Sequence, residues 1–231
     1  MASEADRDIP VITIDGPGGS GKGTVAMRVS ERLGWHLLDS GALYRLVAVA
    51  AMDQGIAADD GPSLGRLAGS LDVNFGASPE GMVVRVDGRD ITARLRSEAV
   101  SAFSSRVAAF PEVRAALVKL QRACRKAPGL VADGRDMGTV IFPDARLKIF
   151  LTASAEARAE RRHKQLKEKG ESVNLSRLFR DIEKRDERDQ SRAVSPLKPA
   201  SDAHLVDSTE MTIEDVVQTV LKLLEELNER H

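Results

Sequence analysis

Five glycines and one lysine follow a short apolar run near the start of the chain. The run Val11–Ile14 ends at Asp15, and the glycines then come in close succession with Lys22 between the last two. Glycine permits backbone conformations that point N–H groups at one anion, and lysine adds a movable positive charge. The pattern predicts a phosphate-binding loop at a helix start, made of Gly16, Pro17, Gly18, Gly19, Ser20, Gly21, Lys22, Gly23 and Thr24.

This loop departs from the usual pattern at the position after the lysine. Gly23 stands where a Ser or Thr normally contacts the metal, and Thr24 comes one residue late. We therefore expect Mg²⁺ to be held mainly by phosphates and water, and Thr24 to contact phosphate. Asp133, at the end of a later apolar run, is a candidate to order the metal-bound water, although an acid at a strand end can also merely cap a turn.

The same glycines also fit a dinucleotide-binding loop. Gly16, Gly18 and Gly21 satisfy G-x-G-x-x-G, and Asp39 ends the next apolar run, where a dinucleotide fold places its ribose-binding acid. Lys22 has no role in hydride transfer but has one in a nucleoside triphosphate site, so it favours the phosphate loop. The chain has no N-K-x-D run, which a GTPase switch would normally show.

Two charged helical segments carry arginines at spacings of three and four, which places them on one helix face. The sets are Arg158, Arg161 and Arg162, and then Arg185, Arg188, Asp189 and Arg192. A solvated, salt-bridged surface is the alternative interpretation. Phosphoryl transfer, however, requires placed positive charge more than covalent chemistry. The histidines show no metal or triad spacing, and an acceptor that is already an anion needs no catalytic base, so we predict a phosphate acceptor.

Short apolar runs alternate with helical patterns along most of the chain, which predicts an α/β fold with a five-stranded parallel sheet flanked by helices. A β-rich segment with a turn at Asp87-Gly88 interrupts the alternation. It predicts a small antiparallel insertion at 61–104 within a single unit of 1–231, whose core is 10–60 and 105–231. Strands are expected at 11–14, 35–39, 129–133, 146–153 and 204–208, and helices after the loop and at 42–53, 97–110, 112–126, 155–170, 175–192 and from 213, with Thr212 as N-cap.

The composition limits the class of protein. The chain has 231 residues with 42% hydrophobic residues and a formal net charge of -1, so a globular protein that does not bind nucleic acid in bulk is expected. A single cysteine, Cys124, excludes an internal disulfide. The acidic first residues do not form a signal peptide, and no apolar run reaches membrane-spanning length. We expect a cytoplasmic protein without a membrane partner.

Four separated motifs resemble the bacterial type of cytidylate kinase, a nucleoside monophosphate kinase family. They are GPGGSGKGT, LLDSGALYR, ADGRDMGTVIFPDA and RDERDQSRAVSPL, in the order that the family uses. The resemblance implies a monomer in which a parallel sheet holds ATP with Mg²⁺. A nucleoside monophosphate-binding part with an added three-stranded sheet would correspond to the insertion, and an arginine-bearing lid to 155–170.

The resemblance also implies roles for individual residues in transfer from ATP to CMP and dCMP. The acceptor phosphate would be held by Arg45, Arg135 and Arg192. The ribose hydroxyls would meet Arg185 and Asp189. The base or its surroundings would be lined by Ser40, Ser105, Arg114 and Asp136. The transferring phosphate would be reached by Arg158 and Arg162, with Lys22 on the donor.

The chemistry of cytosine supports this base assignment. Its N4 amino group donates while N3 and O2 accept, so a carboxylate and a guanidinium are complementary to it, whereas O4 of uracil would oppose the carboxylate. Three alternatives stay open: a kinase of the same fold for UMP or AMP, an oxidoreductase that binds NAD(P), and a regulator that binds ATP without catalysis.

Overall fold

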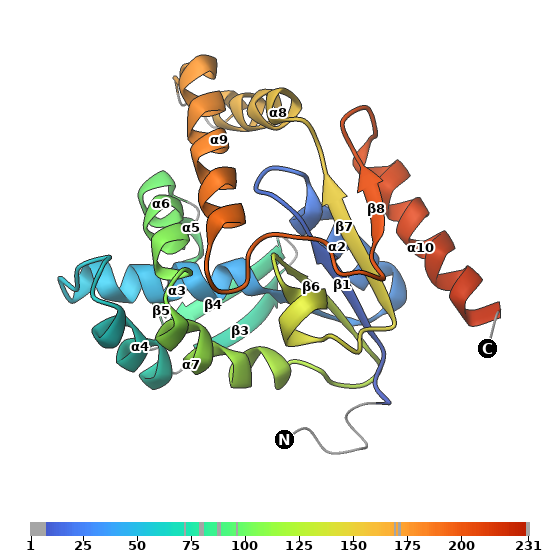
Figure 1. The fold of residues 1–231 in the computed structure, drawn as a ribbon, viewed down its shortest axis with the longest axis horizontal. Helices are drawn as coiled ribbons and strands as arrows, with labels where there is room; N and C mark the ends of the chain where they lie inside the picture. The colour runs from blue at the N-terminus through green and yellow to red at the C-terminus, as the bar shows by residue number, and fades with distance from the viewer. Residues whose placement is uncertain are drawn as a thin grey trace. The chain divides into compact units, whose positions relative to one another are not determined.

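The computed structural model describes residues 8–71, 73–78, 81–86, 89–95, 97–168, 170 and 172–229. The backbone divides into two compact units (Figure 1). The first combines residues 1–38 with 124–231, and the second consists of residues 39–123. The predicted insertion at 61–104 lies inside the second unit, and the predicted turn at Asp87-Gly88 lies outside the described residues.

A five-stranded sheet forms the centre of the first unit, in the order β2-β6-β1-β7-β8. Its strands are β1 (Val11–Asp15), β2 (His36–Asp39), β6 (Leu130–Gly134), β7 (Leu147–Thr152) and β8 (His204–Asp207). β1 pairs in parallel with β6 and with β7, and β7 pairs in parallel with β8. The predicted parallel sheet flanked by helices is therefore confirmed. The chain order changes direction around β1, and ligands of such sheets bind at the carboxyl ends of strands beside this point.

Helices α2 (Lys22–Leu33) and α10 (Ile213–Glu229) pack against each other and against this sheet. Their apolar faces share one core with the strands, which includes Ile14, Val29 and Val217. Thr212 caps α10: its hydroxyl accepts the backbone N–H of Asp215 at 3.2 Å, and the Asp215 carboxylate accepts the N–H of Thr212 at 3.0 Å. The cap predicted at Thr212 is confirmed.

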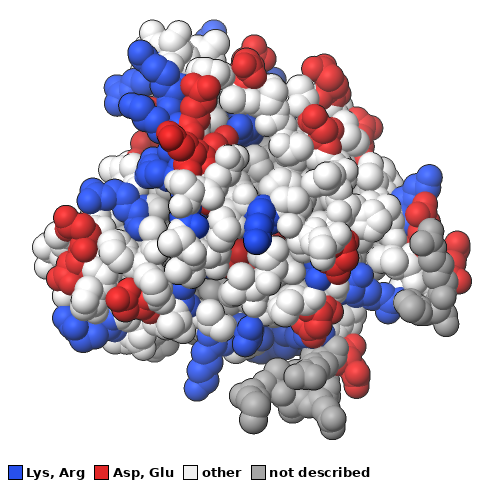
Figure 2. Space-filling view, viewed as in Figure 1, with Lys and Arg blue, Asp and Glu red and all other residues white. Residues whose placement is uncertain are grey.

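Two charged helices, α8 (Ala155–Glu168) and α9 (Leu175–Ser191), complete the first unit and pack against each other. Figure 2, drawn from the same side as Figure 1, shows acidic and basic side chains mixed over the region of these helices. Arg177 and Asp181, for example, face each other on the exposed side of α9 at 3.8 Å. The outer side is thus the solvated, salt-bridged surface of the alternative interpretation. Arg158, which is buried, needs a separate explanation.

The described residues of the second unit form five helices and a three-stranded antiparallel sheet. The helices are α3 (Ser40–Asp53), α4 (Gly61–Ser70), α5 (Thr92–Leu95), α6 (Glu98–Val107) and α7 (Pro111–Arg122). The strands are β3 (Val73–Ser78), β4 (Gly81–Val86) and β5 (Arg89–Asp90), paired in that order. α7 begins at Pro111, in agreement with the expectation that proline suits a first helical turn.

Besides the single turn α5, two helical elements of the described chain were not predicted from the sequence. One is α4, whose three glycines resemble a loop rather than a helix. The other is the π-helical turn η1 (Met137–Ile141), which directly follows Asp136. Both depend on tertiary packing, because glycine-containing and single-turn segments have too little intrinsic propensity to form helices alone.

Candidate functional site

The phosphate loop connects the end of β1 to the start of α2. Gly16 begins it with a φ of 153°, and a Cβ atom there would lie 2.0 Å from the backbone oxygen of Leu151, so only glycine fits. Gly21 precedes the first residue of α2, Lys22, and Thr24 lies exposed in the first turn. The loop therefore presents a helix N-terminus and a lysine, the arrangement that binds phosphate groups.

Lys22, at the start of α2, lies beside Asp133, near the end of β6. Lys22 Nζ is 3.7 Å from Asp133 Oδ1, and both side chains are largely buried. A Cβ atom on Gly23 would be only 3.2 Å from Asp133 Oδ2. The glycine that replaces the usual metal-contacting residue therefore leaves room for a carboxylate beside the lysine.

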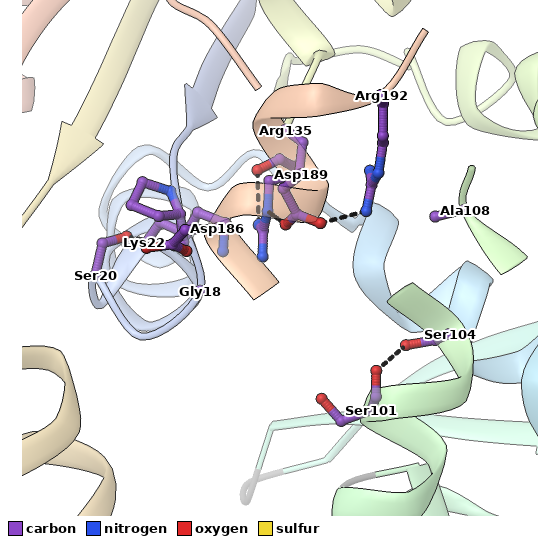
Figure 3. Close-up of polar contacts among 12 residues, drawn as sticks. Gly18, Ser20, Lys22, Ser101, Ser104, Ala108, Arg135, Asp186, Asp189 and Arg192 are labelled. Atoms are coloured by element: carbon purple, nitrogen blue, oxygen red, sulfur yellow. Dashed lines mark hydrogen bonds and ion pairs between the residues drawn. The ribbon is translucent and has the colours of Figure 1, made fainter. Parts of the chain in front are cut away.

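Arg135, Asp189 and Arg192 form one charged cluster (Figure 3). The Nε of Arg135 donates to Asp189 Oδ2 at 3.1 Å, and the Nη2 of Arg192 donates to the other oxygen. Asp189 is only 1% exposed. Burial alone would raise the pKa of Asp189, but Arg135, Arg192 and Arg185 outweigh it and lower the pKa below its usual value. One carboxylate shared between guanidinium groups leaves the cluster with net positive charge.

Arg135 of this cluster and the neighbouring Arg185 also lie against the phosphate loop. A Cβ atom on Gly18 would be 3.5 Å from Arg135 Nη2 and 3.7 Å from Arg185 Nε. The fold thus brings together the loop, the residue after β6 and the C-terminal half of α9, which the sequence separates widely. Positive charge surrounds the phosphate loop, as phosphoryl transfer requires.

Arg158 and Arg161 connect α8 to the phosphate loop, and they do so through different partners. Arg158 is buried and donates to Asp186 Oδ2 at 2.6 Å and to the backbone oxygen of Gly18 at 3.1 Å. Arg161 donates to the hydroxyl of Ser208 at 3.2 Å, and this hydroxyl donates to the backbone oxygen of Ser20, also at 3.2 Å. In the described structure Arg158 is therefore an internal connection between α8, α9 and the loop.

Arg162 is placed differently from these two residues. It is partly exposed, and its Nη1 lies 3.4 Å from Gln165 on the same helix. Helical spacing could not distinguish the three arginines. Arg161 and Ser208 were missed as site residues, and the only available signal was the position of Arg161 on the same face as Arg158.

Asp15 is a further residue that was given no role from the sequence. It ends β1 and is 5% exposed. Its two carboxylate oxygens accept the backbone N–H groups of Met137 at 2.9 Å and Gly138 at 2.8 Å. Burial raises its pKa to about 7, and the charges of Asp136 and Asp133 act in the same direction while the two hydrogen bonds oppose it. Its position at a strand end, directly before the phosphate loop, was the feature of the sequence that could have identified it as a site residue.

The second unit holds the remaining predicted residues. Ser40 and Arg45 lie on α3, Ser105 on α6 and Arg114 on α7. The buried guanidinium of Arg114 donates to the backbone oxygen of Ala108 at 3.2 Å and lies 5.8 Å from the ring centroid of Tyr44. Arg114 is therefore fixed inside its unit against α3, and Tyr44 contributes to its position without having been predicted.

Asp39 caps a helix, which explains the feature that suggested a dinucleotide site. Its carboxylate accepts the backbone N–H of Ala42 at 2.9 Å, at the start of α3. Arg45, one turn further along α3, lies 3.9 Å from the other oxygen. An acid at this position is accounted for by local capping, so it does not require a ribose partner.

The residues around the loop fit a magnesium ion that arrives with a nucleotide. Within the described part of the chain no three His, Cys, Asp or Glu side chains are arranged to hold a metal. One buried carboxylate, Asp133, lies beside the lysine of the phosphate loop. Mg²⁺ in nucleotide sites is typically bound by one or two carboxylates together with phosphates and water, so this donor set is suitable. None of the described helices is long and apolar enough to cross a membrane.

Comparison with known proteins gives consistent results. A family model described as cytidylate kinase matches residues 12–226. A cytidylate kinase of Stutzerimonas stutzeri (strain A1501) is 58% identical over 217 residues, which cover 93% of this chain and 95% of that protein. A cytidylate kinase of Bordetella bronchiseptica is 59% identical over 212 residues, covering 92% and 93% respectively. An uncharacterized protein from Eubacterium ventriosum, 11% identical, shares the fold with a TM-score of 0.51 over 94% of this chain and 98% of that chain.

Proposed function

The chain belongs to the cytidylate kinase family and is a phosphotransferase, and we propose that it moves the γ-phosphoryl group of ATP onto CMP and dCMP by direct in-line transfer. One observation of the site supports this most strongly. The net positive cluster of Arg135, Asp189 and Arg192 lies on the same unit as the phosphate loop, with Arg135 against Gly18. An acceptor phosphate bound by this cluster would lie next to ATP bound in the phosphate loop.

The proposed donor site consists of the backbone of the phosphate loop and Lys22. The loop N–H groups bind the phosphates, and Lys22 offsets negative charge on the terminal ones. Mg²⁺, when bound with ATP, neutralises charge on the phosphate oxygens, and Asp133 would order its water. Gly23 leaves room for that carboxylate, since any Cβ atom at this position would crowd it.

The proposed acceptor roles are those that the family resemblance implies for these residues. Arg135 and Arg192, together with Arg45, would bind the acceptor phosphate, and Arg185 with Asp189 would meet the ribose. Ser40, Ser105, Arg114 and Asp136 would line the base. Asp189 holds the guanidinium groups of Arg135 and Arg192 in place, and the lowered pKa keeps it charged when it does so.

Arg158 and Arg162 are proposed to reach the transferring phosphate when 155–170 closes as a lid. Arg158 would have to leave Asp186 and the Gly18 carbonyl to do this. Closure excludes water, which protects ATP from hydrolysis and strengthens every charge interaction in the site. No general base is required, because the acceptor oxygen belongs to a phosphate that is already an anion.

A nucleotide panel tests the proposed reaction. Release of ADP is measured with ATP and each of CMP, dCMP, UMP and AMP, and binding of NAD(P) is measured in parallel. We expect the highest kcat/KM with CMP, followed by dCMP. Turnover of UMP or AMP above that of CMP would assign a different acceptor, and ATP binding without any transfer would favour the non-catalytic regulator.

Lys22→Ala tests the donor site. The substitution removes the movable charge at the phosphates, so kcat should fall by about 100-fold or more, the scale of losing one transition-state charge contact. Circular dichroism and the unfolding temperature should stay close to those of the wild type, because alanine is a good helix former and Lys22 is the first residue of α2. A kcat near the wild-type value would contradict the role of Lys22.

A further inference from the structure

The backbone between β6 and η1 is attached directly to the strand that leads into the phosphate loop. Asp15, the residue before Gly16, accepts hydrogen bonds from Met137 and Gly138, which follow Asp136 in the chain. We propose that Asp15 is a positioning residue for the acceptor nucleotide, because its carboxylate sets the turn that carries Arg135 and Asp136 relative to the phosphate loop. This inference rests on the acceptor roles proposed above for Arg135 and Asp136.

The carboxylate of Asp15 directly links the loop proposed to bind the donor to the turn proposed to bind the acceptor. In the sheet Asp15 pairs with Gly134, so β1 and β6 end at the same level. The turn that contains Arg135 starts directly after this pair. The next residue after Asp15 is the first of the phosphate loop, and the residue before Met137 is Asp136. A shift of the carboxylate would therefore move the acceptor contacts with respect to the donor.

The turn needs such a partner because its first N–H groups have no partner inside the helix. Asp136 has non-helical angles, φ −145° and ψ 22°, and η1 starts directly after it. Met137 and Gly138 are both buried, so water cannot satisfy their N–H groups. The carboxylate of Asp15 satisfies both.

The close approach also depends on Gly138. A Cβ atom there would lie 2.8 Å from Thr13 Oγ1 and 3.2 Å from Lys148 Cδ. Any side chain would push the turn away from β1 and lengthen the bonds to Asp15. Gly138 and Asp15 are therefore both needed to keep the turn close to β1.

The two N–H groups require two acceptor oxygens at this position, and a carboxylate supplies both. Burial raises the pKa of Asp15, and the charges of Asp136 and Asp133 act in the same direction, so a charged carboxylate is unfavourable there. An asparagine has nearly the same shape, but it offers one acceptor oxygen and turns an N–H group toward the second backbone N–H. Costly charged groups of this kind collect at functional sites, where geometry matters more than stability.

Asp15→Asn is the test, with steady-state kinetics at pH 8 for CMP, UMP and ATP. Loss of one charge-assisted hydrogen bond should raise KM for CMP about tenfold or more and lower the CMP to UMP ratio of kcat/KM, while KM for ATP changes less than about twofold. Hydrogen exchange of the Met137 and Gly138 amides should become faster in the variant. Equal changes in the two KM values, or unchanged exchange, would overturn the proposal.

Two further variants keep the test decisive. Asp215→Asn is a matched control, because Asp215 accepts the N–H and the hydroxyl of Thr212 at 3.0 Å and 2.6 Å in the same unit but lies at the start of α10. It should leave KM for CMP unchanged. If Asp15→Asn does not fold, Gly138→Ala displaces the same turn with the carboxylate intact and should raise KM for CMP selectively; an unchanged KM would again overturn the proposal.

A wrong assignment of the acceptor base can be distinguished from a wrong positioning role for Asp15. If Asp136→Asn leaves the CMP to UMP ratio unchanged, the proposed base contact is wrong. KM for CMP in Asp15→Asn still decides the inference, since Arg135 lies on the same turn and would bind the phosphate whatever the base. A selective rise in that KM supports the positioning role, and its absence refutes it.

Discussion

Asp136 is the residue on which the proposed choice of base depends. It is 3% exposed and lies between Arg135 and the start of η1. A buried carboxylate can accept from N4 of cytosine but opposes O4 of uracil. Base selection in this chain would therefore depend on a single side chain whose place is set by the backbone turn around it.

Asp136→Asn tests that dependence. The amide can donate to O4 of uracil as well as accept from N4 of cytosine, so discrimination should decline. The CMP to UMP ratio of kcat/KM should fall roughly tenfold, the scale of one hydrogen-bonded base contact. A ratio equal to that of the wild type in a coupled ADP assay would remove Asp136 from the base site.

Asp15 should make the stability of the protein depend on pH. Its pKa rises from 3.8 to about 7 in the folded chain, so between these values the folded state binds a proton that the unfolded state has lost. Stability must then decrease as pH rises through this window and become constant above it. The free energy of unfolding of the wild type, relative to Asp15→Asn, should fall by on the order of a few kcal/mol between pH 4 and pH 7.

Urea unfolding of both proteins across that range provides the measurement. Subtracting the Asn variant removes the contribution of other groups that titrate equally in both proteins. A difference that stays constant with pH would mean that the carboxyl keeps its ordinary pKa.

At the scale of elements, α4 shows how packing can make a helix from a glycine-rich segment. A Cβ atom on Gly65 would lie 2.6 Å from Glu112 Cβ on α7, whereas one on Gly69 would lie 4.0 Å from Ala116 Cβ. Asp60 caps the helix by accepting the N–H of Ser63 at 3.0 Å. The glycines therefore differ: Gly65 permits the close contact with α7, and Gly69 has space for a side chain.

Substitution of these two glycines by alanine should consequently have opposite effects. Gly69→Ala should stabilise the protein by up to about 1 kcal/mol, because alanine is the better helix former. Gly65→Ala gains the same propensity but must move α7, so it should destabilise by about 1–3 kcal/mol. Denaturant midpoints of the two variants compare them directly, and equal shifts would show that α4 and α7 are not packed this closely.

At the scale of the whole molecule, the exposed large apolar side chains come from separate segments. Among the described residues they are Met52, Val140, Leu175, Val194 and Leu205. Single exposed apolar residues are normal for a monomer, whereas a stable dimer interface usually needs a larger apolar area. Light scattering behind a sizing column should give a mass near 25.0 kDa, and twice that mass would contradict the expected monomer.

The sequence alone determined the parts whose signals are local. Glycine spacing and Lys22 define the phosphate loop, alternating apolar runs define the parallel sheet, and arginines at spacings of three and four define the charged faces of α8 and α9. These follow from backbone geometry over a few residues, so they can be recognised without tertiary contacts.

Only the tertiary structure decided which of these groups meet. Arg158 pairs with Asp186 while Arg161 binds Ser208, although both lie on one helix face. Asp15 reaches Met137 and Arg135 reaches Asp189 only because strand order and the packing of α9 bring distant segments together. Residue spacing along a helix fixes a direction, but the partner in that direction depends on how the whole chain packs.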